Sequence, residues 1–499
     1  MNILDRRVAA TPERTALVDA ADGHTWRYRD LDALVDRAAA RLQGLAPDAS
    51  RVGTLCVPSP GFVVAFHAAM RLGWSVVGLD PRLPEADIAA RVEQADIDCL
   101  VHGDGSEELP DAVARPALAA CALLEGDIGR GADHSTDGDT SRGADHGRLP
   151  PDATAECRDP AETAVILFTS GTTGSPQGVR LTARNLRASA VASAFQLGVS
   201  PGDRWLDCLP VHHMGGLAPV VRTALYGTTL VVQRSFEVER TARILDEHDI
   251  TGVSLVPTQL RRLLDADAPL SALSTVLVGG APTPESLVER ALAADVPIHP
   301  SYGLTETASQ VATARPAELR QHPGTVGHPL YGLEVTVVDG NEPVGPGERG
   351  ELVVSGPAVT PGYLDAETTE AAFGEWGLHT GDVGVRDEAG RLWVLGRRDD
   401  LVLTGGELVA PRAVVEALRT HPAVDDAAVV GLDDPEWGER IAALVVPDGD
   451  LDAATVRAHC RKRLAAYKCP KTVAFAESLP RTVSGTVDRE AVRDRLRER

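Results

Sequence analysis

The sequence predicts an α/β protein with a large N-terminal domain of layered α/β sheets and a small α+β C-terminal domain. Its 499 residues exceed the roughly 250 to 300 residues that one hydrophobic core usually organises. Short apolar runs alternate with helical stretches, and this alternation builds sheets covered by helices. After the sequence GRRDD at residues 396–400, a new series of expected helices and strands begins. We therefore predict domains at 1–397 and 398–499.

The elements follow from periodicity, taken in chain order. Apolar residues at helical spacing predict an amphipathic helix over 30–42. Short buried strands are expected at 51–57, 75–80, 97–103, 164–170, 252–258, 274–280, 334–339 and 350–356. In the second domain we expect a helix over 412–419, strands over 424–430 and 441–446, and a helix over 454–464.

The apolar pattern collapses between residues 125 and 152, where the sequence RGADH occurs twice, beginning at Arg130 and at Arg142. Polar, Gly-rich and Asp-rich composition cannot bury enough apolar surface to order a segment. We predict a flexible surface insertion. Its His134 and His146 are expected to be solvated rather than to bind a metal.

Charge and composition exclude several classes of protein. The 49 basic and 72 acidic residues give a net charge of −23, which would repel nucleic acid and anionic membranes. No run approaches the ~20 apolar residues of a membrane helix, and the N-terminus lacks the apolar stretch of a signal peptide. We therefore expect a cytoplasmic location and no integral membrane segment. Seven scattered cysteines without CxxC spacing argue against a zinc site or a disulfide framework.

Lysine is scarce, since only Lys462, Lys468 and Lys471 occur among the 49 basic residues. Strong acidity with few lysines is typical of proteins from salt-loving microbes such as haloarchaea, where salt screens a densely acidic surface. We predict a halophilic protein. The sequence indicates no oligomeric state, and a homo-oligomer stays open.

The stretch from Thr169 to Gly178, TSGTTGSPQG, is the first candidate for chemistry. An apolar strand runs directly into it, and hydroxyls with glycine N–H groups can wrap phosphate oxygens. The pattern GxxxxGK[ST] does not occur, so this is not a Walker loop. Taken alone, such a run is often an ordinary surface loop.

Other motifs along the chain decide between a phosphate-binding loop and an ordinary surface loop. The ordered segments TSGTTGSPQG, SYGLTETASQ (301–310), HTGD (379–382), GRRDD and LPRTVSGT (479–486) resemble the adenylate-forming superfamily of acyl-CoA ligases, luciferases and peptide-synthetase adenylation domains. The resemblance covers nearly the whole chain. It implies activation of a carboxylic acid by ATP as an acyl-adenylate, followed by transfer of the acyl group to coenzyme A.

The resemblance also implies residue roles. Tyr302 would stack on adenine, Thr305 would contact the α-phosphate, and Glu306 would hold Mg²⁺, a cation that prefers carboxylate and phosphate oxygens. Asp382 would bind the ribose hydroxyls with help from Arg397. The remaining nucleotide contacts are assigned to Thr169, Ser170, Gly171, Thr172, Thr173, Gly174, Gly280, Ala281 and Gly303.

In this superfamily the C-terminal domain rotates between the two half-reactions. Asp399 occupies the hinge position, so the resemblance implies that the two domains are joined by a hinge. The run Gly405-Gly406-Glu407 matches the loop that lines the pantetheine tunnel, and we assign Gly406 to coenzyme A. Closure of this kind would protect a reactive anhydride from water.

Two departures from the pattern bear on catalysis. The phosphate loop usually ends in PKG but here has Gln177, and the C-terminal SGK motif here ends in Thr486. The missing C-terminal lysine would remove a cation where negative charge builds up during adenylation. We expect Arg481, Lys471 or Arg489 to replace it, with Arg481 as the first candidate, or adenylation to be slow.

The acyl pocket resembles that of the o-succinylbenzoate–CoA ligase family of menaquinone synthesis, through LPVHHMGG (209–216) and TETASQ (305–310). His213 would lie beside the acyl group. Because o-succinylbenzoate keeps a second carboxylate, that charge must be paired, and Arg222 is our candidate partner. Thr258, Ser309 and Gln310 are further candidates for substrate contacts.

Two alternatives remain at this point. One is a CoA ligase for another aryl or medium-chain fatty acid, which would need no cation in the acyl pocket. The other is a degenerate protein that binds ATP without turnover, which the missing lysine allows. Retention of Glu306, Asp382 and Arg397 together speaks against the second.

Overall fold

The computed structural model describes residues 3–103, 106, 113–124, 159, 161–169, 176–404, 407–481 and 487–497, without the side chains of residues 399 and 408. The expected insertion at 125–152, with His134 and His146, lies outside the described residues. So do Ser170 to Gly174, Gly405, Gly406 and the SGT motif at 484–486. Among the helices that are described, none is both long and apolar enough to cross a membrane.

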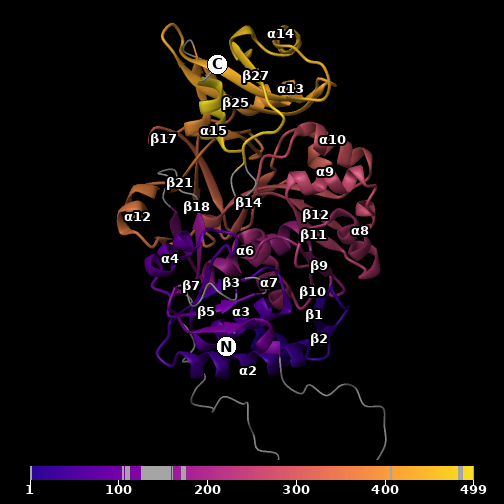
Figure 1. Ribbon diagram of the computed structural model, residues 1–499, viewed down its shortest axis with the longest axis vertical. Helices are drawn as coiled ribbons and strands as arrows, with labels where there is room; N and C mark the ends of the chain where they lie inside the picture. Colours follow the sequence, from indigo (N-terminus) through magenta and orange to yellow (C-terminus); the bar gives the residue numbers. More distant parts are fainter. Residues whose placement is uncertain are drawn as a thin grey trace, which may run out of the picture.

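Two large, mainly parallel sheets form the greater part of the molecule (Figure 1). The seven-stranded sheet has the order β19-β8-β7-β4-β3-β5-β6, with β19 Gly362–Tyr363, β8 Gln177–Thr182, β7 Thr163–Thr169, β4 Ser75–Gly78, β3 Arg51–Leu55, β5 Cys99–His102 and β6 Ala117–Ala119. The nine-stranded sheet has the order β15-β14-β13-β12-β11-β9-β10-β1-β2, with β15 His328–Pro329, β14 Ser309–Thr313, β13 Ile298–Leu304, β12 Thr275–Val278, β11 Gly252–Leu255, β9 Arg204–Asp207, β10 Thr229–Val232, β1 Thr15–Asp19 and β2 Thr25–Arg27.

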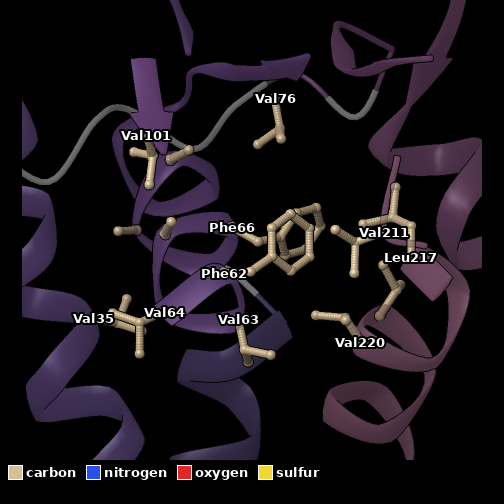
Figure 2. Packing of buried hydrophobic residues seen from close by; sticks show 14 of the residues in the cluster. Val35, Phe62, Val63, Val64, Phe66, Val76, Val101, Val211, Leu217 and Val220 are labelled. Atoms are coloured by element: carbon tan, nitrogen blue, oxygen red, sulfur yellow. The ribbon is translucent and has the colours of Figure 1, made fainter. Parts of the chain in front are cut away.

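Helices between and around these sheets bury both faces. A single apolar cluster joins α3 (Pro60–Leu72) and α7 (Met214–Tyr226) to the inner faces of both sheets. Phe62 and Phe66 of α3 point toward Val211, Leu217 and Val220 on the α7 side (Figure 2). The other helices of this part are α1 Ile3–Ala10, α2 Tyr28–Leu45, α4 Glu85–Gln94, α6 Ala183–Leu197, α8 Val238–Glu247, α9 Pro257–Asp265, α10 Glu285–Ala293 and α11 Pro316–Gln321, with 3₁₀ turns at Cys121–Leu124, Leu270–Ala272 and Thr305–Thr307.

A third, antiparallel sheet follows in the chain. It has the order β17-β16-β18-β21-β20, and β22 also pairs with β21. The elements are β16 Glu334–Asp339, β17 Glu342–Pro343, β18 Arg349–Ser355, α12 Ala366–Ala372, β20 Phe373–Gly374, β21 Gly377–Arg386 and β22 Leu392–Arg397. Its apolar face packs against Tyr302, Val311 and Leu330, which come from the edge of the nine-stranded sheet or its border. The predicted nucleotide motifs of residues 301–310 and 379–397 therefore meet across this contact.

The C-terminal residues form a fourth sheet with its own cores, in the order β24-β23-β26-β25, with β27 beside β26. The elements are β23 Val402–Thr404, β24 Glu407–Val409, α13 Pro411–Arg419, β25 Val424–Asp434, β26 Gly438–Pro447, α14 Ala453–Arg461, β27 Thr472–Phe475 and α15 Arg489–Arg497, with 3₁₀ turns at Arg398–Asp400 and Ala466–Lys468. The predicted fold class is confirmed, while the boundary at 397/398 stays a prediction.

Most predicted elements occur with shifted ends. The first predicted helix extends to Tyr28 and Leu45, because Asp30 accepts a hydrogen bond from the Arg27 backbone N–H and fixes an earlier start. The phosphate loop was expected to run to Gly178. It ends earlier, because Gln177 and Gly178 pair with Thr169 and Phe168 as the beginning of strand β8.

Candidate active site

Tyr302, Asp382 and Arg397 come together where the third sheet meets the nine-stranded sheet. The Tyr302 hydroxyl donates to Oδ2 of Asp382 at 2.8 Å, and Nη1 of Arg397 lies 3.4 Å from Oδ1. The register explains the second contact, because Asp382 of β21 and Arg397 of β22 are cross-strand partners. Burial raises the pKa of Asp382, and the Arg397 charge opposes that shift. The carboxylate keeps lone pairs for further donors, such as two neighbouring hydroxyls.

Glu306 lies in the tight turn between β13 and β14. Its Oε1 accepts a hydrogen bond from the Tyr363 hydroxyl at 3.0 Å, and its backbone oxygen accepts from the Thr360 N–H at 2.7 Å. Gly303 permits this turn, because a Cβ there would lie 1.8 Å from the Ser309 oxygen. Burial raises the pKa of Glu306 above its ordinary value of 4.5. A half-buried carboxylate held by one hydroxyl is suited to a cation on its other oxygen.

The flanks of the phosphate loop connect to Glu306 through pairs of strands. Thr169 and Gln177 pair in the β7–β8 hairpin, and Val179 of β8 pairs with Tyr363 of β19. Tyr363 then donates to Glu306. The two segments expected to converge on one nucleotide therefore belong to one continuous neighbourhood, although Ser170, Gly171, Thr172, Thr173 and Gly174 lie outside the described residues.

Two histidines precede helix α7 near the carboxyl end of β4. The rings of His212 and His213 are 4.5 Å apart, and Nε2 of His212 lies 3.5 Å from Oδ2 of Asp80. Burial lowers the pKa of His212 to about 3 and also lowers that of His213, so both rings are neutral at pH 7. Gly78 allows this approach, because a Cβ there would lie 3.0 Å from the His212 Cα. Strand β4 pairs with β7, so these rings lie beside the strand that leads into the phosphate loop.

Arg222 on α7 is buried, with 6 % of its surface exposed. Its Nη2 donates to the Ser309 hydroxyl at 3.2 Å, while its Nε has no partner. No carboxylate within the described part of the chain forms an ion pair with it, and burial lowers its pKa. Arg222 packs beside Ser189, Ala218 and Ala308. A buried cation with a free donor is suited to an anionic group of a ligand.

The other predicted substrate residues are placed differently. Gln310 is buried with its Nε2 donating to Thr313 at 2.7 Å, and its Oε1 has no partner. Thr258 is exposed at the start of α9, and no described contact joins it to Arg222. Gly280 and Ala281 are both exposed, and a Cβ on Gly280 would lie 3.6 Å from the Val256 Cγ1. Thr305 is half-buried at the start of the Glu306 turn.

The three candidates for the missing cation all have partners in this arrangement. Arg481 donates to Oδ2 of Asp426 at 2.8 Å, and Arg489 forms an ion pair with Asp400. The Lys471 ammonium lies 3.6 Å from the centre of the Trp437 ring. Asp399 lies in a 3₁₀ turn of residues 398–400, and its side chain is outside the described atoms, as are Gly406 and Thr486.

Sequence reasoning missed two side chains that contact the site residues, Tyr363 and Asp80. Tyr363 ends the run GPAVTPGY, and its hydroxyl orients Glu306. Asp80 ends the strand-like run SVVGLD, which is where polar residues of parallel sheets face a ligand. Its position at the end of a strand-like run could have indicated Asp80 as a site residue. For Tyr363, only the pairing of β19 with β8 reveals the contact.

The layered fold and this site define an enzyme that handles a nucleotide and an acid. The chain belongs to the AMP-binding enzyme family, which it matches over residues 4–364, and it matches the C-terminal domain of that family over 414–486. It is 34 % identical to 2-succinylbenzoate–CoA ligase of Bacillus pumilus (strain SAFR-032), with 99 % of this chain and 98 % of the relative covered.

Solved structures of o-succinylbenzoate CoA synthetase from Bacillus subtilis are similar over the whole length at 31 % identity. The complex with the acyl-adenylate intermediate OSB-AMP has a TM-score of 0.88, with 99 % of this chain and 98 % of that chain covered. The complex with ATP and magnesium ion has a TM-score of 0.85, covering 99 % of each. A double mutant bound with the product analogue OSB-NCoA has a TM-score of 0.72, covering 100 % and 98 %.

Proposed function

We propose that this enzyme makes o-succinylbenzoyl-CoA from o-succinylbenzoate, ATP and coenzyme A through an acyl-adenylate, as a step of menaquinone biosynthesis. Full-length similarity to ligases of that name supports the reaction. The observation that carries the substrate is the buried Arg222 guanidinium beside Ser309, which has a free donor and no described carboxylate partner. The aromatic carboxylate of o-succinylbenzoate would supply that partner.

In the first half-reaction, the succinyl carboxylate attacks the α-phosphorus of ATP. A new carboxylate oxygen to phosphorus bond forms, the α–β phosphoanhydride bond breaks, and pyrophosphate leaves. Asp382 and Arg397 would hold the ribose and Tyr302 the adenine, so that the α-phosphorus faces the acid. Positioning of the two reactants supplies most of the acceleration in such a transfer.

Magnesium fits the residues present. A single carboxylate together with ATP phosphates is a common magnesium environment, and Glu306 offers such a carboxylate with one oxygen bound to Tyr363. When bound, the ion neutralises phosphate charge. Tyr363 orients Glu306 through its hydrogen bond.

In the second half-reaction, the thiol of coenzyme A attacks the acyl carbonyl. A carbon–sulfur bond forms, the acyl–phosphate bond breaks, AMP leaves, and the thiol proton passes to a base or solvent. His213 is neutral because burial lowers its pKa, so it cannot supply a positive charge in the acyl pocket. Arg222 would therefore supply the positive charge that pairs with the aromatic carboxylate of o-succinylbenzoate.

The experiment measures pyrophosphate release and thioester formation with a panel of acids at high salt. Thioester formed from o-succinylbenzoate alone supports the proposal. Equal activity with benzoate or hexanoate would instead favour a broader CoA ligase. Absence of adenylation with every acid would favour a protein that binds ATP without turnover, which Gln177 and Thr486 keep as the alternative. Cytoplasmic location and halophilic character stay predictions, and a homo-oligomeric state stays open.

A further inference from the structure

Arg412, in the first turn of α13, connects the C-terminal residues to two segments of the large N-terminal part. Its Nη2 donates to the backbone oxygen of Thr283 at 3.0 Å, and its Nη1 donates to that of Val394 at 3.3 Å. Its Nε donates to Glu416, one turn further along α13, at 2.8 Å. Each of the three guanidinium nitrogens thus has a partner. The planar fork of arginine suits such simultaneous binding.

The two carbonyl partners lie beside segments of the candidate active site. Thr283 follows the Gly280–Ala281 loop and comes two residues before α10 begins at Glu285. Val394 lies on β22, three residues before Arg397, whose guanidinium contacts Asp382. The Arg412 side chain is 26 % exposed, so its hydrogen bonds are largely shielded from water. A single guanidinium therefore holds α13 against two segments that border the candidate active site, those of Thr283 and Val394.

Carboxylates from both sides surround this contact. Burial raises the pKa of Glu285, the negative charges of Glu416 and Glu289 raise it further, and Arg412 opposes the shift. Glu285 and Glu289 belong to α10, whereas Glu416 belongs to α13. Without the Arg412 charge, like charges would face one another across the contact and favour its opening.

We propose that Arg412 is a positioning residue that holds the C-terminal domain in the arrangement used for adenylation. This inference rests on the proposed function and on the domain rotation implied by the family resemblance. The structure is more similar to the acyl-adenylate complex of the Bacillus subtilis enzyme than to its OSB-NCoA complex, with TM-scores of 0.88 and 0.72. A rotation near Asp399 moves Arg412 away from Thr283 and Val394, which both precede that residue.

Glu416 lowers the free energy needed to break the contacts of Arg412 with the N-terminal part. It lies on the same helix as Arg412 and keeps its ion pair with the guanidinium at any domain angle. Only the two bonds to backbone carbonyls break, and water replaces them. The contact therefore biases the domain toward the adenylation arrangement without locking it.

The test compares Arg412→Gln with Arg440→Gln. Arg440 is a matched control, because it donates to the Thr472 hydroxyl and the Asp433 carbonyl, both within the C-terminal fold. Pyrophosphate exchange with ATP and o-succinylbenzoate, without coenzyme A, reports adenylation. A single turnover of preformed acyl-adenylate with coenzyme A reports thioester formation. For Arg412→Gln we expect adenylation to fall about tenfold, while thioester formation stays equal or rises.

An Arg412→Lys variant, which keeps the charge but not the fork, should recover part of the adenylation rate. Equal loss of both half-reactions in Arg412→Gln, or no loss in either, would overturn the inference. Hydrogen exchange of the amides at the start of α10 provides a readout without substrate, and it should speed up in Arg412→Gln but not in Arg440→Gln. If the wild-type enzyme activates no acid, the proposed function fails, and the exchange measurement alone decides the role of Arg412.

Discussion

Replacing Arg222 by methionine should affect activity and stability in opposite directions. The guanidinium is buried, and its only described polar partner is the Ser309 hydroxyl at 3.2 Å. In the enzyme–substrate complex it would pair with the aromatic carboxylate of o-succinylbenzoate. Removing one partner of a buried charge pair costs about 3 kcal/mol, and about 1.4 kcal/mol corresponds to a tenfold change in rate. We therefore expect kcat/KM for o-succinylbenzoate to fall about 100-fold.

The same substitution should stabilise the free protein. Methionine removes a desolvated charge that lacks a described counter-ion, and it fills a similar volume. We expect the free energy of unfolding to rise by about 1 kcal/mol, measured by urea titration without ligands. Steady-state thioester formation gives kcat/KM. Undiminished turnover of o-succinylbenzoate by Arg222→Met would refute the assignment of this residue to the substrate carboxylate.

A second buried arginine supplies the matched control. Arg71 at the end of α3 has 8 % of its side chain exposed, like Arg222, but it contacts Asp5, Asp32 and Asp36 at 2.8, 2.5 and 2.6 Å. Arg71→Met should destabilise the protein by about 2 kcal/mol, less than for a fully buried pair, because its partners are about one-third exposed. Its kcat/KM should stay near the wild-type value. If kcat/KM of Arg71→Met fell as much as that of Arg222→Met, lost packing would explain the loss of activity in both variants.

Three further variants concern the predicted nucleotide site. Glu306→Gln should lower pyrophosphate exchange about 100-fold, with a higher magnesium requirement measured by titration. Because burial raises the folded pKa of Glu306, the folded protein binds more protons than the unfolded chain between pH 4.5 and that pKa. Stability should therefore fall as pH rises through this window, and Glu306→Gln should remove that contribution in urea titrations at several pH values. Tyr363→Phe should raise the pKa of Glu306 further, since its hydrogen bond favours the charged carboxylate, and should shift the acidic limb of the exchange rate to higher pH. Tyr302→Phe removes the donor to Asp382 and should raise KM for ATP about fivefold, or about 1 kcal/mol, with kcat little changed.

Sequence motifs selected Tyr302, Glu306, Asp382 and Arg397, because each lies within a short recognisable segment, and their roles toward a nucleotide stay predictions. Sheet pairing then brings them together, as the β21–β22 register does for Asp382 and Arg397. The contact of Tyr363 with Glu306 spans 57 residues and depends on a two-residue edge strand. Neither periodicity nor a local motif indicates such a partner.

The surroundings of Arg222 and His212 and the contact made by Arg412 were harder to predict. Arg222 could be nominated from the resemblance, but its lack of a described counter-ion depends on how α7 packs against Ser309. The carboxylate beside His212 is contributed by Asp80, which lies 132 residues earlier in the chain. Arg412 has an ordinary helix-surface pattern with Glu416, and its carbonyl partners appear only once α13 is placed beside Thr283. Long-range packing sets all three contacts.

The position of the three lysines has a practical consequence. Lys462, Lys468 and Lys471 all lie within one stretch of ten residues in the C-terminal fold, beside α14 and β27. Among side chains, amine-reactive dyes would therefore attach to the C-terminal fold alone, without any engineered cysteine. A second fluorophore placed on the N-terminal part would let energy transfer test whether the C-terminal fold turns during the catalytic cycle.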